Sequence, residues 1–225
     1  MNRREALKKM GILATGMAVS STGIARIADV PQNKKRKMKI LAINGSARKQ
    51  SNTGDMIDIV LEPLAQAGHE IEKVNLAGET VNPCKACFAC AGKRNCVWQN
   101  DCFCGLYEKM AAADVLIIGS PTYSADVSAV LKAVFERASV VSDVNPGMFT
   151  HKIGAGLVVG RRAGTMNALD SINHFFLNKE MFVVGSTYWN LAYGRLPGEA
   201  LIDTEGVETM QNLGKNIAWL LEKVQ

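Results

Sequence analysis

Short apolar segments alternate with longer amphipathic segments from residue 38 to the end of the chain. Apolar runs and apolar–polar alternation predict five strands, at residues 38–45, 69–77, 115–123, 152–160 and 181–190. Apolar positions at helical spacing predict five helices, at residues 51–68, 106–114, 128–141, 165–178 and 205–224. Strands and helices therefore follow one another in turn through this whole region.

This alternation predicts a single α/β domain. Strands joined by helical crossovers form a parallel sheet that carries helices on both faces. The run VLIIG at residues 115–119 is apolar throughout, as expected for a strand that is buried on both sides. Ligands of such open sheets bind outside the carboxyl ends of the strands, where the strand order reverses. The loops that follow the strands are therefore the first place to look for a site.

The loop after the first predicted strand has the chemistry of a phosphate site. It reads GSARKQSNT, residues 45–53, and opens a helix for which Asn52 or Thr53 is the expected cap. Helix N-termini offer unpaired N–H groups and a partial positive charge. Further donors come from Ser46, Arg48, Ser51, Asn52 and Thr53. The loop lacks both the P-loop ending and the G-x-G-x-x-G fingerprint, and taken alone it is also compatible with an ordinary capped turn.

Two further loops at the same predicted edge suit a flat ligand. GSPTYSAD follows the third strand, where Pro121 stiffens the turn and Tyr123 offers a ring that can stack. GRRAG follows the fourth strand, where Gly160 and Gly164 allow close backbone approach and Arg161 adds a cation. A half-buried turn aromatic and a solvated arginine pair would explain each loop separately, but the three together predict one binding site.

These loops, in this order, resemble those of flavodoxin-like NAD(P)H-dependent FMN reductases. The resemblance rests on ILAINGSARKQSNT, ADVLIIGSPTYSADVSAVLKAVFER and VVGRRAG, and it extends over residues 38–224. It implies a three-layer flavodoxin-like fold of residues 38–225 with strand order 2-1-3-4-5. It also implies FMN, with its phosphate at residues 46–53 and its ring system against residues 121–124 and 160–164. The expected FMN-binding residues are Ser46, Arg48, Ser51, Asn52, Thr53, Pro121, Thr122, Tyr123, Ser124, Gly160, Arg161 and Gly164.

A cysteine-rich insertion, residues 82–105, separates the second strand from the next helix. Its thiols have the spacing C-x2-C-x2-C-x5-C, at Cys84, Cys87, Cys90 and Cys96. Thiolates are soft ligands for zinc, copper(I) and iron–sulfur clusters. Zinc usually takes two ligand pairs separated by a longer loop, whereas ferredoxins use C-x2-C-x2-C runs. Disulfides between such close neighbours are strained, yet disulfides and thiols without any metal remain alternatives.

Within the family, this spacing resembles the compact motif of iron–sulfur flavoproteins. The resemblance implies a [4Fe-4S] cluster near the FMN, with Cys84, Cys87, Cys90 and Cys96 as its ligands, in a homodimer or homotetramer. Cys102 and Cys104 fall outside the motif. We expect these two to be buried thiols or alternative ligands.

Charge and apolarity set the N-terminal segment apart from the rest of the chain. Residues 1–39 carry ten Lys/Arg and two Asp/Glu, whereas residues 40–225 carry sixteen and nineteen. The net charge of +5 therefore gives no reason to expect nucleic-acid binding. Arg3 and Arg4 precede a modest apolar run that is too short to span a bilayer.

This segment is typical of a signal peptide, and its paired arginines resemble the twin-arginine export signal. A basic tail or a short amphipathic helix is the alternative for residues 1–37. We expect export to the periplasm or another extracytoplasmic compartment, with a cytoplasmic location as the alternative. The mature chain is expected to have no transmembrane segment.

Three functions follow from these patterns. The first is an FMN-dependent electron-transfer protein that passes electrons between FMN and a [4Fe-4S] cluster, with a redox protein or a quinone as its partner. The second is an FMN-only FMN or quinone reductase. NAD(P)H is a candidate donor in both. The third is a zinc-binding module without enzymatic activity. No protein acid or base is required by the first scheme, so we expect no catalytic residue of that kind.

Overall fold

The computed structural model describes residues 36–224. The strands are β1 (Lys39–Asn44), β2 (Glu70–Asn75), β3 (Val115–Pro121), β4 (Ile153–Gly160), β5 (Phe182–Val183) and β6 (Leu191–Tyr193). The helices are α2 (Asn52–Gln66), α3 (Phe103–Ala112), α4 (Ala129–Asp143), α5 (Thr165–Leu177), the 3-10 turn η1 (Glu199–Ile202) and α6 (Thr204–Lys223). The predicted export signal, residues 1–37, lies outside the described residues except for Arg36 and Lys37.

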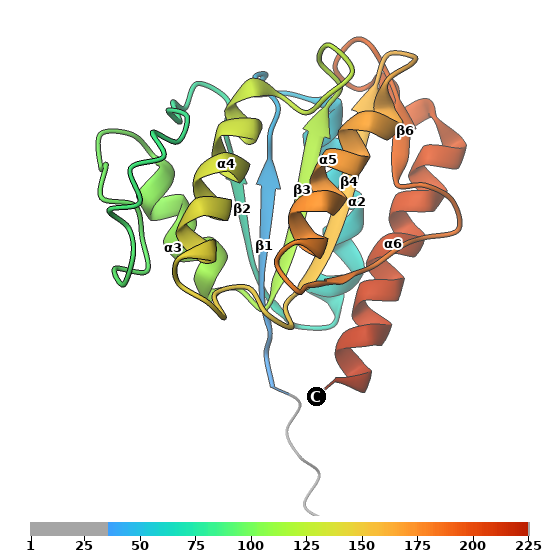
Figure 1. Ribbon diagram of the computed structural model, residues 1–225. Helices are drawn as coiled ribbons and strands as arrows, with labels where there is room; N and C mark the ends of the chain where they lie inside the picture. The colour runs from blue at the N-terminus through green and yellow to red at the C-terminus, as the bar shows by residue number, and fades with distance from the viewer. Residues whose placement is uncertain (1–35, 225) are drawn as a thin grey trace, which may run out of the picture. The chain divides into compact units, whose positions relative to one another are not determined.

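The sheet has the predicted flavodoxin-like arrangement. All strand pairs are parallel, and the order is β2-β1-β3-β4-β5. The predicted order 2-1-3-4-5 is therefore confirmed. The chain reverses its direction across the sheet at β1, since β2 lies on one side of β1 and β3 on the other. The carboxyl ends of the strands meet at the upper edge in Figure 1.

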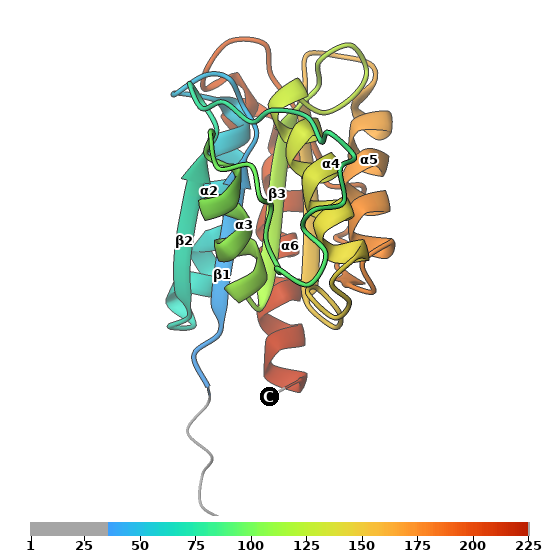
Figure 2. The same ribbon diagram turned by 60° about the vertical axis from the view of Figure 1, so that its left-hand side comes forward.

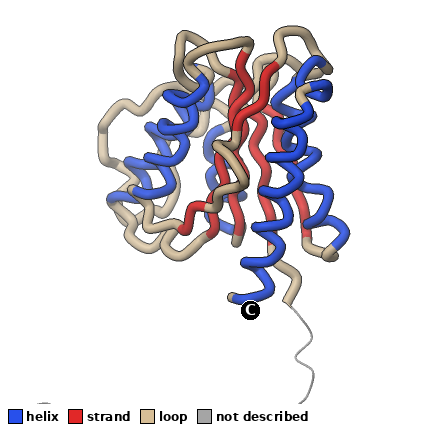
Figure 3. Tube along the Cα trace, turned by 90° about the vertical axis from the view of Figure 1, so that its right-hand side faces the viewer, coloured by secondary structure: helices blue, strands red, loops and turns tan. Residues whose placement is uncertain are grey.

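Helices cover both faces of the sheet, which gives three layers (Figures 1 and 3). α2 and α6 pack on one face around buried residues such as Ile57, Leu213 and Ile217. α3, α4 and α5 pack on the other face around a second apolar cluster. The sheet face and the helices approach closely at Gly154, where an added Cβ would lie 2.7 Å from the Phe176 ring. Burial of these apolar surfaces is the main favourable contribution to the folded state.

The fifth strand differs from the prediction. Only β5 and β6 of the predicted segment 181–190 and its continuation pair with β4, and residues 184–190 leave the sheet between them. The polar groups of this loop bond to α6 instead. Ser186 Oγ donates to the Thr209 carbonyl at 2.7 Å, and Asn216 Nδ2 donates to the Gly185 carbonyl at 2.9 Å. These bonds draw the chain away from the edge of β4, so that β6 joins the sheet further along.

The cysteine-rich insertion runs beside α3 and α4 (Figure 2). α3 begins at Phe103, three residues before the predicted start, because the Asp101 carboxylate accepts the Phe103 N–H at 3.1 Å and so satisfies an N-terminal amide. Within residues 36–224, no helix combines the length and apolarity needed to cross a bilayer.

Candidate functional site

The loop between β1 and α2 is held in place by its own side chains. Ser51 is the cap of α2, with its Oγ accepting the Gly54 N–H at 3.1 Å. Asn44 Nδ2 also donates to this Oγ at 3.2 Å, and Asn44 Oδ1 accepts the Ser46 N–H at 3.1 Å. Ser51 is an acceptor in both bonds, so its O–H remains able to donate to a ligand. Ser51 therefore caps the helix, in place of the predicted Asn52 or Thr53.

The segment after β6 forms the opposite wall of this loop. Asn52 Nδ2 donates to the Leu196 carbonyl at 2.9 Å, and Asn52 Oδ1 accepts the Ala200 N–H at 3.3 Å. Arg48 Nη1 donates to the Arg195 carbonyl at 3.0 Å. The side-chain oxygen of Asn52 is thus engaged with the chain itself. For a bound anion, Asn52 can offer its backbone N–H at the start of α2.

The loop after β3 is a tight turn. Tyr123 and Asp126 exchange backbone hydrogen bonds of 2.9 and 3.0 Å, with Ser124 and Ala125 between them at positive φ. The Asp126 carboxylate accepts the Ser171 hydroxyl of α5 at 2.6 Å and the Val127 N–H at 2.7 Å. Burial would raise the pKa of Asp126, but these hydrogen bonds, together with Lys132, hold it below its ordinary value. The turn presents the half-exposed Tyr123 ring at the sheet edge.

The three predicted loops meet at one cavity of about 200 Å³. Nine predicted FMN-binding residues line it: Ser46, Arg48, Ser51, Asn52, Thr53, Pro121, Thr122, Tyr123 and Arg161. Three predicted residues do not line it: Ser124, Gly160 and Gly164. Ser124 belongs to the turn. An added Cβ on Gly160 would overlap Thr165 Cγ2, and one on Gly164 would lie 2.9 Å from Ala125, so both glycines allow the loops to pack.

Sequence reasoning missed the third side of this cavity. Val159, Gly194 and Arg195 also line it. An added Cβ on Gly194 would lie 2.5 Å from the Ala200 nitrogen, so only glycine lets this segment approach so closely. The available signal was the Gly-Arg pair at 194–195, which follows a short apolar segment just as the Gly160-Arg161 pair does.

An unpaired hydroxyl indicates that this cavity is built for a polar ligand. Thr122 Oγ1 is buried and has no hydrogen-bond partner among the described residues. Leaving such a group unpaired costs about 1–3 kcal/mol. The cavity also combines the N-terminus of α2, buried hydroxyls and arginine side chains. These donors fit a phosphate ester, and the Tyr123 ring fits a flat aromatic system beside it.

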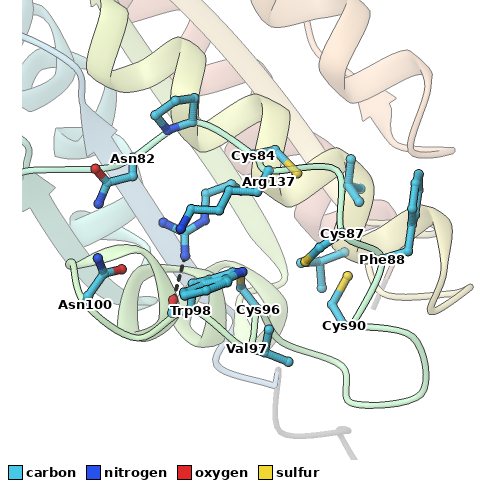
Figure 4. Close-up of a pocket in the computed structure, with 14 residues that line it drawn as sticks. Asn82, Cys84, Cys87, Phe88, Cys90, Cys96, Val97, Trp98, Asn100 and Arg137 are labelled. Carbon is cyan, nitrogen blue, oxygen red and sulfur yellow. Dashed lines mark hydrogen bonds between the residues drawn. The ribbon is translucent and has the colours of Figure 1, made fainter.

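The four motif cysteines line a second cavity, of about 280 Å³ (Figure 4). Cys90 is buried, Cys87 is exposed, and Cys84 and Cys96 are intermediate. Arg137, Val140 and Val141 of α4 line the same cavity. Figure 4 shows Trp98 and Phe88 at its margin. The loop is folded through left-handed residues at Ala86, Phe88 and Arg94.

The environments of two of these thiols differ. A backbone hydrogen bond at Ala89, followed by a contact with Trp98, lowers the pKa of Cys87. Burial raises the pKa of Cys90. Cys102 and Cys104 do not line the cavity. Their thiols contact backbone carbonyls, Cys102 that of Thr80 at 3.3 Å and Cys104 that of Trp98 at 3.3 Å, and burial raises both pKa values.

The thiol arrangement fits a cluster better than a single ion. In a cubane cluster each thiolate binds a different iron atom, so the sulfurs surround the group rather than meet at one point. Among residues 36–224, no three His, Cys, Asp or Glu side chains are arranged to hold one metal ion. A tetrahedral zinc site requires such convergence. The six cysteines are all free thiols.

Comparison with known proteins agrees with both cavities. The family described as NADPH-dependent FMN reductase matches residues 38–195, more than half of the chain. An iron–sulfur flavoprotein of Methanocaldococcus jannaschii is 33% identical over 196 residues, which cover 84% of this chain and 100% of that protein. An iron–sulfur flavoprotein of Methanosarcina thermophila is 36% identical over 193 residues, which cover 84% of this chain and 97% of that protein.

Solved structures share the fold. The crystal structure of RosB with a bound 8-demethyl-8-formylriboflavin-5'-phosphate intermediate has a TM-score of 0.68 at 18% identity, covering 84% of this chain and 80% of that one. An NAD(P)H:quinone oxidoreductase from Methanothermobacter marburgensis has a TM-score of 0.61 at 15% identity, covering 81% and 96%. The chain thus belongs to the NADPH-dependent FMN reductase family and is a flavin-dependent oxidoreductase.

Proposed function

We propose that this protein is an iron–sulfur flavoprotein that transfers electrons between FMN and a [4Fe-4S] cluster. The observation that carries the proposal is that Cys84, Cys87, Cys90 and Cys96 line one cavity, although they are spread over thirteen residues of irregular chain. The names of the two relatives, iron–sulfur flavoproteins at 33% and 36% identity, support it independently.

The residues of the first cavity are proposed to bind and orient FMN. Ser46, Ser51 and the N-terminal amides of α2 hold the phosphate, and Arg48 and Arg161 neutralise its charge. Thr122 offers its unpaired hydroxyl to a polar atom of the ligand. Tyr123 packs against the ring system, which is held at the end of β3.

The residues of the second cavity are proposed to ligate the cluster and limit its exposure. Cys84, Cys87, Cys90 and Cys96 bind as thiolates, while Val140 and Val141 form an apolar wall. When bound, FMN exchanges electrons in pairs or singly and the cluster exchanges them singly. Together the two sites can link a two-electron donor such as NAD(P)H with a one-electron redox protein, or with a quinone. A homodimer or homotetramer is proposed as the working assembly.

Residues 1–37 are proposed to direct export through a twin-arginine pathway, with the cofactors inserted before transport. The paired Arg3 and Arg4 support this proposal. Replacing both by Lys should leave the protein in the cytoplasm, as measured by cell fractionation. Equal distribution of this variant and the unchanged chain would contradict the proposal and favour the cytoplasmic alternative.

The test of the cluster is elemental analysis of the full-length chain purified anaerobically. About four iron and four acid-labile sulfide per FMN are expected. Cys84→Ser and Cys90→Ser should lose iron, whereas Cys102→Ser and Cys104→Ser should keep it, since these two thiols lie outside the cavity. FMN without iron in the unchanged protein would instead identify a flavin-only reductase. Zinc without FMN would identify a metal-binding module.

A further inference from the structure

An arginine lies buried against the cysteine cavity. Arg137, on α4, has a side chain only 3% exposed, and it lines the cavity together with the four cysteines. Its Nη1 pairs with Asp101 Oδ2 at 2.5 Å, and its Nη2 donates to the Trp98 carbonyl at 2.8 Å. Its guanidinium carbon lies 4.1 Å from the centre of the Phe103 ring. A guanidinium has five N–H donors, so these two bonds leave others available for the cavity.

Asp101 fixes the direction in which this ion pair points. Its carboxylate is fully buried and does not line the cavity. It accepts the Asn82 backbone N–H at 2.8 Å, Asn82 Nδ2 at 2.9 Å and the Phe103 N–H at 3.1 Å. Asp101 thereby ties both ends of the cysteine-rich insertion to α4. The pair presents its positive end to the thiols and keeps its negative end behind.

The charge around the cavity is unbalanced in favour of cations. Its charged lining residues in the described chain are Lys85 and Arg137, with no carboxylate among them. Lys85 lies over the exposed face of Trp98, 3.6 Å from the ring centroid, where solvent and salt screen it. Arg137 is shielded from solvent, so its charge acts at full strength over short distances. Burial lowers the pKa of Arg137, but a hydrogen bond to Cys96 and the charges of Cys96 and Asp101 raise it above its usual value.

We propose that Arg137 is a positioning residue that donates a hydrogen bond to the Cys96 sulfur and raises the reduction potential of the bound cluster. The inference rests on the proposed cluster. A cluster with four thiolates carries net negative charge, and reduction by one electron makes it more negative. A fixed cation therefore stabilises the reduced form more than the oxidised form, and hydrogen bonds to the sulfurs act in the same direction. Asp101 opposes this effect through its own charge while it holds Arg137 in place.

The experiment is an anaerobic redox titration of the full-length protein, with the reduced cluster followed by electron paramagnetic resonance. Arg137→Gln is expected to disfavour reduction by about tenfold, or 59 mV for a one-electron couple. Arg137→Lys should retain part of the effect because it keeps the charge without the fork of donors. Asp101→Asn removes the opposing charge and should shift the potential in the other direction. Glu72→Gln, from an exposed ion pair with Lys109, is the matched charge control and should leave the potential unchanged.

Opposite shifts for Arg137→Gln and Asp101→Asn support the proposal. Shifts of the same sign, or equal potentials with intact iron content, overturn it, because a merely structural pair would act through both partners alike. If Arg137→Gln loses its iron, Arg137→Lys and Asp101→Asn still decide the sign. Absence of iron from the unchanged protein would refute the cluster itself, and that outcome is distinct from a cluster whose potential ignores Arg137.

Discussion

The side-chain amide of Asn52 donates a hydrogen bond to the carbonyl of Leu196, 144 positions further along the chain. Its oxygen accepts the N–H of Ala200 in the same segment. The first residue of α2 therefore fixes the C-terminal wall of the FMN cavity. The phosphate loop and this wall are one unit, although the wall begins where the family match ends, at residue 195.

Asn52→Ala is expected to weaken FMN binding by about tenfold and to destabilise the protein by about 1–3 kcal/mol, since it removes two hydrogen bonds. Fluorescence titration with FMN and denaturant unfolding measure the two effects. Gln66→Ala, at the exposed far end of the same helix, is the control and should change neither. Unchanged FMN affinity in Asn52→Ala would show that the C-terminal wall does not form the ligand site.

Thr122→Val replaces a buried, unpaired hydroxyl by a methyl group of similar size. The protein without FMN should be as stable or more stable, because the uncompensated polar atom is gone. FMN affinity should fall by about tenfold if the hydroxyl bonds the ligand. Thermal unfolding of the FMN-free protein and FMN titration report the two effects separately. Equal loss of stability and affinity would indicate a packing defect rather than a lost ligand bond.

Gly160→Ala is expected to destabilise the protein by about 1–3 kcal/mol, since the new Cβ overlaps Thr165 Cγ2. Thr165→Ser removes that methyl group. The double variant Gly160→Ala/Thr165→Ser should therefore recover part of the stability lost in Gly160→Ala. Urea unfolding of the two single variants and the double variant gives this coupling. Additive losses would mean that the two residues do not share this contact.

Asp126 predicts a dependence of stability on acid. Its folded-state pKa lies below that of the unfolded chain, which is about 3.9. Its contribution is therefore fully present above about pH 4 and is lost as the pH falls through the lower, folded-state pKa. Asp126→Asn should be less stable than the unchanged protein at pH 7, by at most about 1 kcal/mol because the side chain is partly exposed. The difference should shrink at pH 3, as thermal unfolding by circular dichroism would reveal. A constant difference would assign the effect to lost hydrogen-bond geometry.

The sequence was most informative where local pattern alone determines structure. Alternating strands and helices predicted the sheet order, and the loop after β1 placed Ser46 and Ser51 correctly at the sheet edge. The pattern failed where partners distant in sequence decide. Ser186 and Asn216 break the fifth strand through bonds between β5 and α6, and no local periodicity contains such bonds. Arg195 enters its site for the same reason, because its segment is positioned by Asn52.

One helix belongs to both cavities. α4 begins after Ser128, directly behind the Tyr123 turn, and nine residues further on it carries Arg137 into the cysteine cavity. A helix rises about 1.5 Å per residue, so this span measures roughly 14 Å along the axis. α4 thus works as a rigid spacer between the two redox centres of the proposed function. Insertions or movements in either loop can alter what each cavity binds, but the distance an electron has to cover stays set by the length of a buried helix.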